Sequence, residues 1–363
     1  MPEGATEEPT LDPKKSIILG LLGLAVIVLI FVRVIPQIGS YQDAVTSLKS
    51  MSPGAVTFIV LSVIVYLGAY GLPFMAATPG LGYWRSQQLN QGAFAISNGV
   101  PAGGAFGLGV QYAMLASYSV GPTVSTAAIT AVGIWSIFVT LWLPILGVAA
   151  IQLSGQAASS YFWPAVLGVL LLVVAVVGFA LIVRSQNAAR RIGSIGNRVA
   201  APLIHRFRKG RSVDFVPAAL RFRADIADLV TRRWPAITAA QVSVSVAQFL
   251  IFYMSLRGVE GWGSAGTSLL VAFAAFAVAQ IGLMIPLTPG GLGTVDAAMI
   301  ALLTALGVDP GAATAADLVW RAASFVPQIV IGVIALITWS RQGTRALAER
   351  EAARHESAEE AEA

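Results

Sequence analysis

The chain has 363 residues, of which 56% are hydrophobic and 11% are charged. Soluble domains carry about 25% charged residues, so this composition predicts an all-α polytopic membrane protein. The chain has no cysteine, and its two histidines, His205 and His355, lie in polar segments. Disulfides, thiolate catalysis and cysteine-ligated metals are therefore excluded, and we expect neither a metal site nor a cofactor.

Residues 1–15 are polar and acidic, and they form a predicted cytoplasmic tail. The transmembrane domain is predicted at 16–339, with six apolar runs that are each long enough to cross the hydrocarbon layer. These full spans are predicted at 16–35, 56–77, 125–153, 161–183, 236–256 and 313–339. The first run is too long for a signal-peptide core, so we expect it to be retained. Residues 340–363 form a charged tail, which we also place in the cytoplasm.

Two apolar segments do not follow the pattern of a simple span. Residues 78–91 are polar with one charged residue, Arg85, and the apolar segment 92–120 then contains Pro101, Gly103 and Gly104. Proline and glycine break helices, because proline lacks a donor and glycine loses much entropy on ordering. Broken backbone inside a membrane persists only where protein buries it or where it lines a wet cavity.

The second broken segment, at 268–308, is the more pronounced one. Its helix-breaking residues are Pro286, Pro289, Gly290, Gly291 and Gly293. An apolar helix is predicted to follow, with Thr294 as its N-cap and Asp296 in its first turn, and to end at Gly307. A discontinuous membrane helix of this kind is typical of a transporter site.

Basic residues concentrate between the two halves of the chain. The segment 184–233 holds twelve Lys and Arg against three Asp, so 12 − 3 gives a net charge of +9. Basic loops of this length stay in the cytoplasm, which predicts the orientation of every span. We expect the segment to contact anionic lipid head groups through an interfacial helix. Nucleic-acid binding is the rival interpretation, but the orientation rule alone explains the charge.

An internal repeat relates the two broken segments. Shifting the chain by 188 positions aligns Pro101 with Pro289 and Pro122 with Pro310 without a gap. The predicted orientation makes the first broken segment enter and leave on the cytoplasmic side and the second on the outer side. The repeats, 56–153 and 236–339, are therefore predicted to have inverted topology, as in secondary transporters.

Asp296 and Arg321 are ionisable residues within predicted membrane segments, where such residues are costly and usually functional. Arg321 is a candidate phosphate ligand, with Asp296 as its partner or as a ligand for a cationic group. The structural alternative is that Asp296 only complements its helix N-terminus while Arg321 pairs with Asp317 at i,i+4. For Asp317 the structural interpretation is preferred.

The glycines also predict two helix N-termini that point into the membrane. Free N–H groups at Gly103, Gly104 and the 290–294 turn could bind an anion. Alternatively, the glycines only permit close helix packing. Amide side chains could line a polar path or serve as interhelical hydrogen-bonding groups; they are Gln280, Gln111, Asn98, Gln241 and Gln248.

Enzyme motifs are not supported. The G-x-G within 291–296 follows no strand, so a dinucleotide fold is not expected. No P-loop is present, and neither histidine can join a catalytic triad inside the membrane. We therefore expect a protein without catalytic residues.

The stretch 286–299, PLTPGGLGTVDAAM, together with LLTALGV and Arg321, resembles the transmembrane, flippase-type domain of lysylphosphatidylglycerol synthases. The resemblance covers roughly 16–339, without the soluble aminoacyl-transferase domain, so lipid aminoacylation is not expected. It differs in the first half, where neutral Gln111 follows the Pro-Gly break. The family implies a domain that flips aminoacylated phospholipid or related lipid-linked molecules.

The leading hypothesis is thus a translocase for a phospholipid or lipid-linked molecule with an anionic head group. The alternative is a secondary transporter of a small anionic solute that uses the same site. We expect a multi-pass protein of the bacterial plasma membrane with both termini in the cytoplasm. The sequence leaves the oligomeric state open.

Overall fold

The structure is a computed structural model, and it describes residues 49–99, 103–155, 215–263, 266–284 and 289–362, with residue 46 and a few positions between 177 and 197. Within these residues the regular structure is entirely helical, without strands. Four helical stretches among them are long and apolar enough to cross a membrane: Pro53–Ala77, Pro122–Leu153, Arg232–Glu260 and Pro310–Arg341. They coincide with four of the predicted spans. The predicted span 16–35 and almost all of 161–183 lie outside the described residues.

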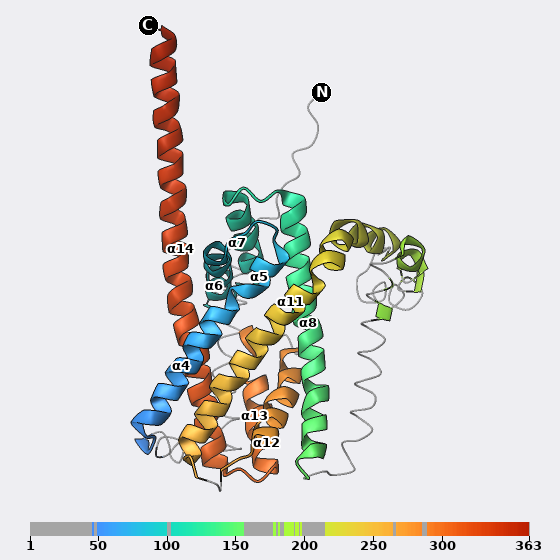
Figure 1. Ribbon diagram of the computed structural model, residues 1–363, viewed down its shortest axis with the longest axis vertical. Coiled ribbons are helices and arrows are strands. Elements are labelled where there is room, and N and C mark those ends of the chain that lie inside the picture. The colour runs from blue at the N-terminus through green and yellow to red at the C-terminus, as the bar shows by residue number, and fades with distance from the viewer. Residues whose placement is uncertain are drawn as a thin grey trace, which may run out of the picture.

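Four long helices run along the bundle: α4 (Pro53–Tyr70), α8 (Pro122–Leu153), α11 (Phe215–Glu260) and α14 (Pro310–Glu362). Two shorter pairs lie at opposite ends of it (Figure 1). One pair, α6 (Tyr83–Gly99) and α7 (Gly103–Ser117), lies at the end from which α14 projects. The other pair, α12 (Leu269–Ala279) and α13 (Thr294–Ala305), lies at the far end, joined through the short helices η3 (Gln280–Met284) and η4 (Pro289–Gly291).

The polar stretch 78–91 is helical over most of its length, because α6 begins at Tyr83. The reason lies in the preceding span, where Pro73 and Gly71 separate α4 from α5 (Leu72–Ala77). Such a break leaves carbonyl groups without helical partners. Side chains of α6 supply those partners: the Tyr83 hydroxyl donates to the Gly68 carbonyl at 2.7 Å, and the Asn90 amide donates to the Tyr70 carbonyl. The polar residues therefore form one face of a helix.

The turns after α7 and α13 are alike at the 188-residue spacing. The helices end at Ser117 and Ala305, and the next helices begin at Pro122 and Pro310. In each turn a valine N–H donates to a leucine carbonyl five residues earlier at 3.0 Å, from Val120 to Leu115 and from Val308 to Leu303. The turn residue has a positive φ in both places, 63° at Ser119 and 91° at Gly307.

Small residues allow the helices to pack closely. A Cβ at Gly332 of α14 would lie 2.2 Å from the Gln91 carbonyl oxygen of α6, so these two backbones are in contact. Earlier in α14, the Trp320 ring packs edge-on against Phe252 and Phe276 of α11 and α12. Glycine contact and aromatic packing together fix the position of α14. The residue that follows Trp320 is Arg321.

Candidate functional site: a polar cavity beside a helix break

A cavity of about 650 Å³ lies inside the bundle. Residues of α4, α6, α7, α8, α11, α14 and the 280–295 region line it, so both broken segments contribute to its wall. Arg321 is the one charged side chain among the described lining residues. The other polar groups are amides and hydroxyls, so the cavity offers hydrogen bonds and a single guanidinium.

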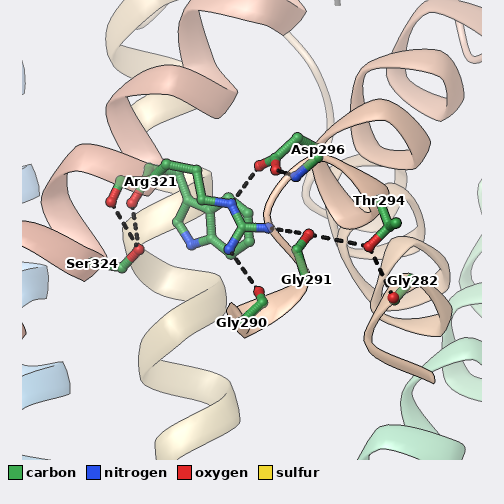
Figure 2. A network of polar contacts seen from close by, with 9 residues as sticks. Gly282, Gly290, Gly291, Thr294, Asp296, Arg321 and Ser324 are labelled. Carbon is green, nitrogen blue, oxygen red and sulfur yellow. Dashed lines mark hydrogen bonds and ion pairs between the residues drawn. The ribbon is translucent and has the colours of Figure 1, made fainter. Parts of the chain in front are cut away.

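The guanidinium of Arg321 is held by three partners (Figure 2). Its Nε donates to Asp296 Oδ1, while Nη1 and Nη2 donate to the carbonyl oxygens of Gly290 and Gly291, each at 3.3 Å. The group also lies 4.4 Å from the ring centre of Trp320 and 5.2 Å from that of Phe325. An arginine has five N–H donors, so two of them are not engaged by the described residues. Their geometry suits a phosphate oxygen.

Asp296 is fully buried and serves two partners at once. One carboxylate oxygen accepts from Arg321 Nε, and the other accepts from the Gly293 N–H at the start of α13. Both readings of Asp296 from the sequence, ion pairing and completion of the helix N-terminus, therefore hold together. The alternative pairing of Arg321 with Asp317 is wrong, because the salt bridge goes to Asp296.

The backbone of the break explains this arrangement. Gly290, Gly291 and Gly293 have φ values of 61°, 66° and 88°, which other residues rarely adopt. Thr294 was predicted to be the N-cap of α13, and this is wrong. Gly293 takes the cap position, and Thr294 is the first residue of the helix. The Thr294 hydroxyl instead donates to the carbonyl oxygens of Gly282 and Gly291, at 2.9 and 3.2 Å. This ties the break to η3 (Figure 2).

Asp317 is the second buried carboxylate near the site. It is fully buried on α14, and within the described residues neither carboxylate oxygen has a hydrogen-bond partner. Asp296 and Arg321 are the charged groups that act on it electrostatically. It does not line the cavity. Among the described residues, no group of three His, Cys, Asp or Glu side chains could hold a metal ion.

The remaining predicted site residues divide into two groups. Gly104 at the start of α7 and Gln280 at the start of η3 line the cavity. Gly103 does not, since a Cβ there would lie 2.1 Å from the Ile96 carbonyl oxygen, so this glycine permits α6 and α7 to pack. The other amides of the predicted polar path also line the cavity: Gln111, Asn98, Gln241 and Gln248. Among these, Gln241 also bonds the Val132 carbonyl at 3.0 Å.

The two breaks lie close together. A Cβ on Gly290 would be 3.0 Å from Asn98 Oδ1, near the end of α6. The helix N-termini differ in their availability, however. Gly104 lines the cavity, whereas the Gly293 N–H of α13 is already taken by Asp296. Residues 100–102 and 285–288 lie outside the described residues.

Sequence reasoning missed a set of hydroxyl groups that share the cavity. They are Tyr66, Tyr70, Ser97, Ser136, Thr140 and Ser245. A signal was available, because Tyr66 and Tyr70, and likewise Ser136 and Thr140, are four residues apart in apolar helices. That spacing places each pair on one helix face.

Replacing Gly290 by alanine should destabilise the fold. The left-handed φ would cost about 1–2 kcal/mol in an L-residue. The new Cβ would also lie 2.6 Å from Phe325 Cζ, so that ring would have to move. Gly109→Ala is the matched control, since Gly109 lies within α7 and a Cβ there meets no atom within 4 Å. Thermal unfolding in detergent should show a lower midpoint for Gly290→Ala alone. Equal midpoints for the two variants would contradict the requirement for glycine at position 290 of this turn.

The fold and the cavity together define a multi-pass helical membrane protein with a polar site beside a helix break. The chain belongs to the family described as the lysylphosphatidylglycerol synthase TM region, whose model matches residues 19–332. The resemblance identified in the sequence is thereby confirmed. A stretch of 69 residues is also 45% identical to a UPF0104 membrane protein of Methanothermobacter thermautotrophicus. That match covers 19% of this chain and 20% of the relative, so the chain aligns with about a fifth of that protein's length.

Proposed function

We propose that this protein translocates a phospholipid or lipid-linked molecule with an anionic head group between membrane leaflets. The observation that carries the proposal is the position of Arg321, the one charged side chain among the described residues that line a polar cavity. Arg321 is 7% exposed, and the part of the chain that the structure describes leaves two of its N–H donors without a partner. Its role is to bind and orient a phosphate rather than to catalyse a reaction.

The depth of Arg321 supports a ligand that moves across the membrane. The spanning part of α14 begins at Pro310, and Arg321 lies eleven residues further along. At about 1.5 Å per residue this is roughly 16 Å, close to the middle of a hydrocarbon layer about 30 Å thick. A site at the midplane can be reached from either leaflet in turn.

The cavity wall has an exposed side, which favours a lipid over a soluble anion. The apolar lining residues Leu108 of α7 and Leu283 of η3 are 45% and 39% exposed. Gly133 and Ser136 of α8 line the same cavity and are also exposed. An exposed apolar rim beside a polar cavity allows acyl chains to stay in lipid while the head group enters. An enclosed solute site would need no such rim.

In alternating access the site opens to one leaflet and then to the other, which requires two structural elements that can exchange conformations. The matching turns at 188 residues, and the opposite ends occupied by α6–α7 and α12–α13, support two repeats of inverted topology. We place the α6–α7 end and both termini in the cytoplasm, because the basic segment 184–233 requires it. In that orientation, in the plasma membrane, this segment would lie on anionic lipid.

The topology can be tested because the chain has no cysteine. Gly121 and Asp309 are equivalent exposed positions of the two repeats, just before α8 and α14. An impermeant thiol reagent added to intact cells should label Asp309→Cys but not Gly121→Cys, and both should be labelled after permeabilisation. Labelling of both from outside would exclude inverted repeats.

The function itself is tested with purified protein in liposomes that carry fluorescent phosphatidylinositol. Quenching from outside reports how fast the labelled lipid changes leaflet. We expect faster exchange than in protein-free liposomes, and no uptake of radiolabelled inorganic phosphate by the same vesicles. Phosphate uptake without lipid exchange would instead support a transporter of small anions.

A further inference from the structure

The charges around the cavity select against cationic head groups. The buried carboxylates nearest to Arg321 are Asp296 and Asp317, and neither lines the cavity. Asp296 is committed to Arg321 and to the Gly293 N–H. A ligand amine would therefore find no carboxylate among the described lining residues. Moving an amine from water to such a site would leave its charge without a partner, which is costly.

The uncharged part of the wall is suited to hydroxyl groups. An amide side chain both donates and accepts hydrogen bonds, as does a sugar or inositol hydroxyl. Gln280 is the clearest case, because it is 3% exposed, lines the cavity, and its Nε2 has no hydrogen-bond partner in the described part of the chain. A buried donor left unpaired costs about 1–3 kcal/mol. A ligand hydroxyl at this position would remove that penalty.

An aromatic row runs along the cavity toward the guanidinium. Tyr70, Phe94 and Phe325 follow one another with ring centres 5.7 and 5.5 Å apart, and Phe325 lies 5.2 Å from Arg321. All four residues line the cavity. The row gives an apolar surface for the C–H face of a ring, while the amide of Gln280, whose Nε2 has no partner among the described residues, can bond its hydroxyls. The volume, about 650 Å³, lies within the range of about 300–1,000 Å³ typical of ligand sites.

We propose that the cavity accepts a head group made of one phosphodiester and a neutral cyclic polyol, such as inositol or a sugar. The phosphodiester contacts Arg321, and the polyol contacts Gln280 and the neighbouring amides along the aromatic row. This inference rests on the proposed translocase function and names its substrate class. Aminoacylated lipids, which carry an amine, are poor ligands on this account.

Lipid exchange in liposomes tests the substrate class and the translocase function separately. Full-length protein is reconstituted with acyl-labelled phosphatidylinositol, lysylphosphatidylglycerol or phosphatidic acid, which has a phosphate without a polyol. We expect phosphatidylinositol to exchange at least tenfold faster than lysylphosphatidylglycerol. Equal or faster exchange of lysylphosphatidylglycerol would overturn the substrate class while leaving lipid translocation intact. Absence of exchange for every lipid would overturn the proposed function.

The role of the amide is tested with Gln280→Leu. It should slow phosphatidylinositol several-fold and leave phosphatidic acid unchanged. Gln91→Leu is the matched control, because Gln91 is also fully buried and its side-chain amide is unpaired among the described residues, but it lies outside the cavity lining. Its rates should equal those of the unmodified chain. Parallel effects of the two substitutions on both lipids would overturn polyol recognition by Gln280.

Discussion

Replacing Arg321 with lysine is expected to reduce lipid translocation by roughly ten- to a hundredfold while the protein still inserts and folds. Lysine keeps the charge, but it cannot hold Asp296 and two carbonyl oxygens while also presenting two N–H groups to a phosphate. Charge-assisted hydrogen bonds contribute about 1.5–3 kcal/mol each, and about 1.4 kcal/mol corresponds to tenfold. The measurement is leaflet exchange of labelled phosphatidylinositol in liposomes with equal amounts of protein.

Arg257→Lys is the control for this substitution. Arg257 is also buried, at 8% exposure, and it contacts Glu260 and the Gly263 carbonyl, but it does not line the cavity. Arg257→Lys should lower the stability of the fold at most and should leave lipid translocation unchanged. Unchanged translocation in Arg321→Lys, or an equal loss in Arg257→Lys, would leave Arg321 with a structural role only.

Replacing Asp296 with asparagine is expected to cause the largest loss of stability. The substitution keeps the size of the side chain but removes the countercharge of a buried guanidinium. Removing one partner of a buried ion pair costs about 3–5 kcal/mol. The backbone N–H of Gly293 would also bond to a neutral acceptor instead of a carboxylate. Thermal unfolding in detergent should therefore show a markedly lower midpoint.

Asp317→Asn provides an internal comparison, because both carboxylates are fully buried and close in the fold. The Asp317 oxygens make no hydrogen bond to the described residues, so an uncharged amide should be tolerated or should stabilise the protein. We expect the midpoint of Asp317→Asn to equal or exceed that of the unmodified chain. Similar losses in both variants would mean that the Arg321–Asp296 pair is not the main stabilising contact.

Much of this architecture could be predicted from the order of residues. The 188-residue shift predicted that each broken segment ends in a turn with proline and is followed by a span. The helices begin at the aligned residues Pro122 and Pro310, because a proline after a turn favours the first position of a helix. The glycines at 290–293 predicted a break, since their φ values require residues without a Cβ.

Other features depend on contacts between distant segments. The helix over the polar stretch 78–91 was not predicted, because nothing local shows that the α4–α5 break supplies carbonyls for Tyr83 and Asn90. The choice of Asp296 over Asp317 as partner of Arg321 was also undetermined. Local spacing favours an i,i+4 pair, whereas the break brings Asp296 from 25 residues away. The full set of residues that line the cavity, including its hydroxyl groups, could be identified only from the packed helices.

Two adjacent single cysteines test whether a lipid head group crosses the membrane through the cavity. Ser136 of α8 lines the cavity, whereas its neighbour Ile137 is 52% exposed and does not line it. Each residue is replaced by cysteine in the natural cysteine-free chain, and the purified protein is modified with a bulky thiosulfonate reagent before reconstitution. Labelling of both sites is verified by mass.

Leaflet exchange of phosphatidylinositol is then measured before and after the bulky group is removed with a reductant. We expect that modification at position 136 stops exchange and that reduction restores it, while modification at position 137 has little effect. Unchanged exchange with the bulky group at position 136, under verified full labelling, would contradict passage of the head group through this cavity.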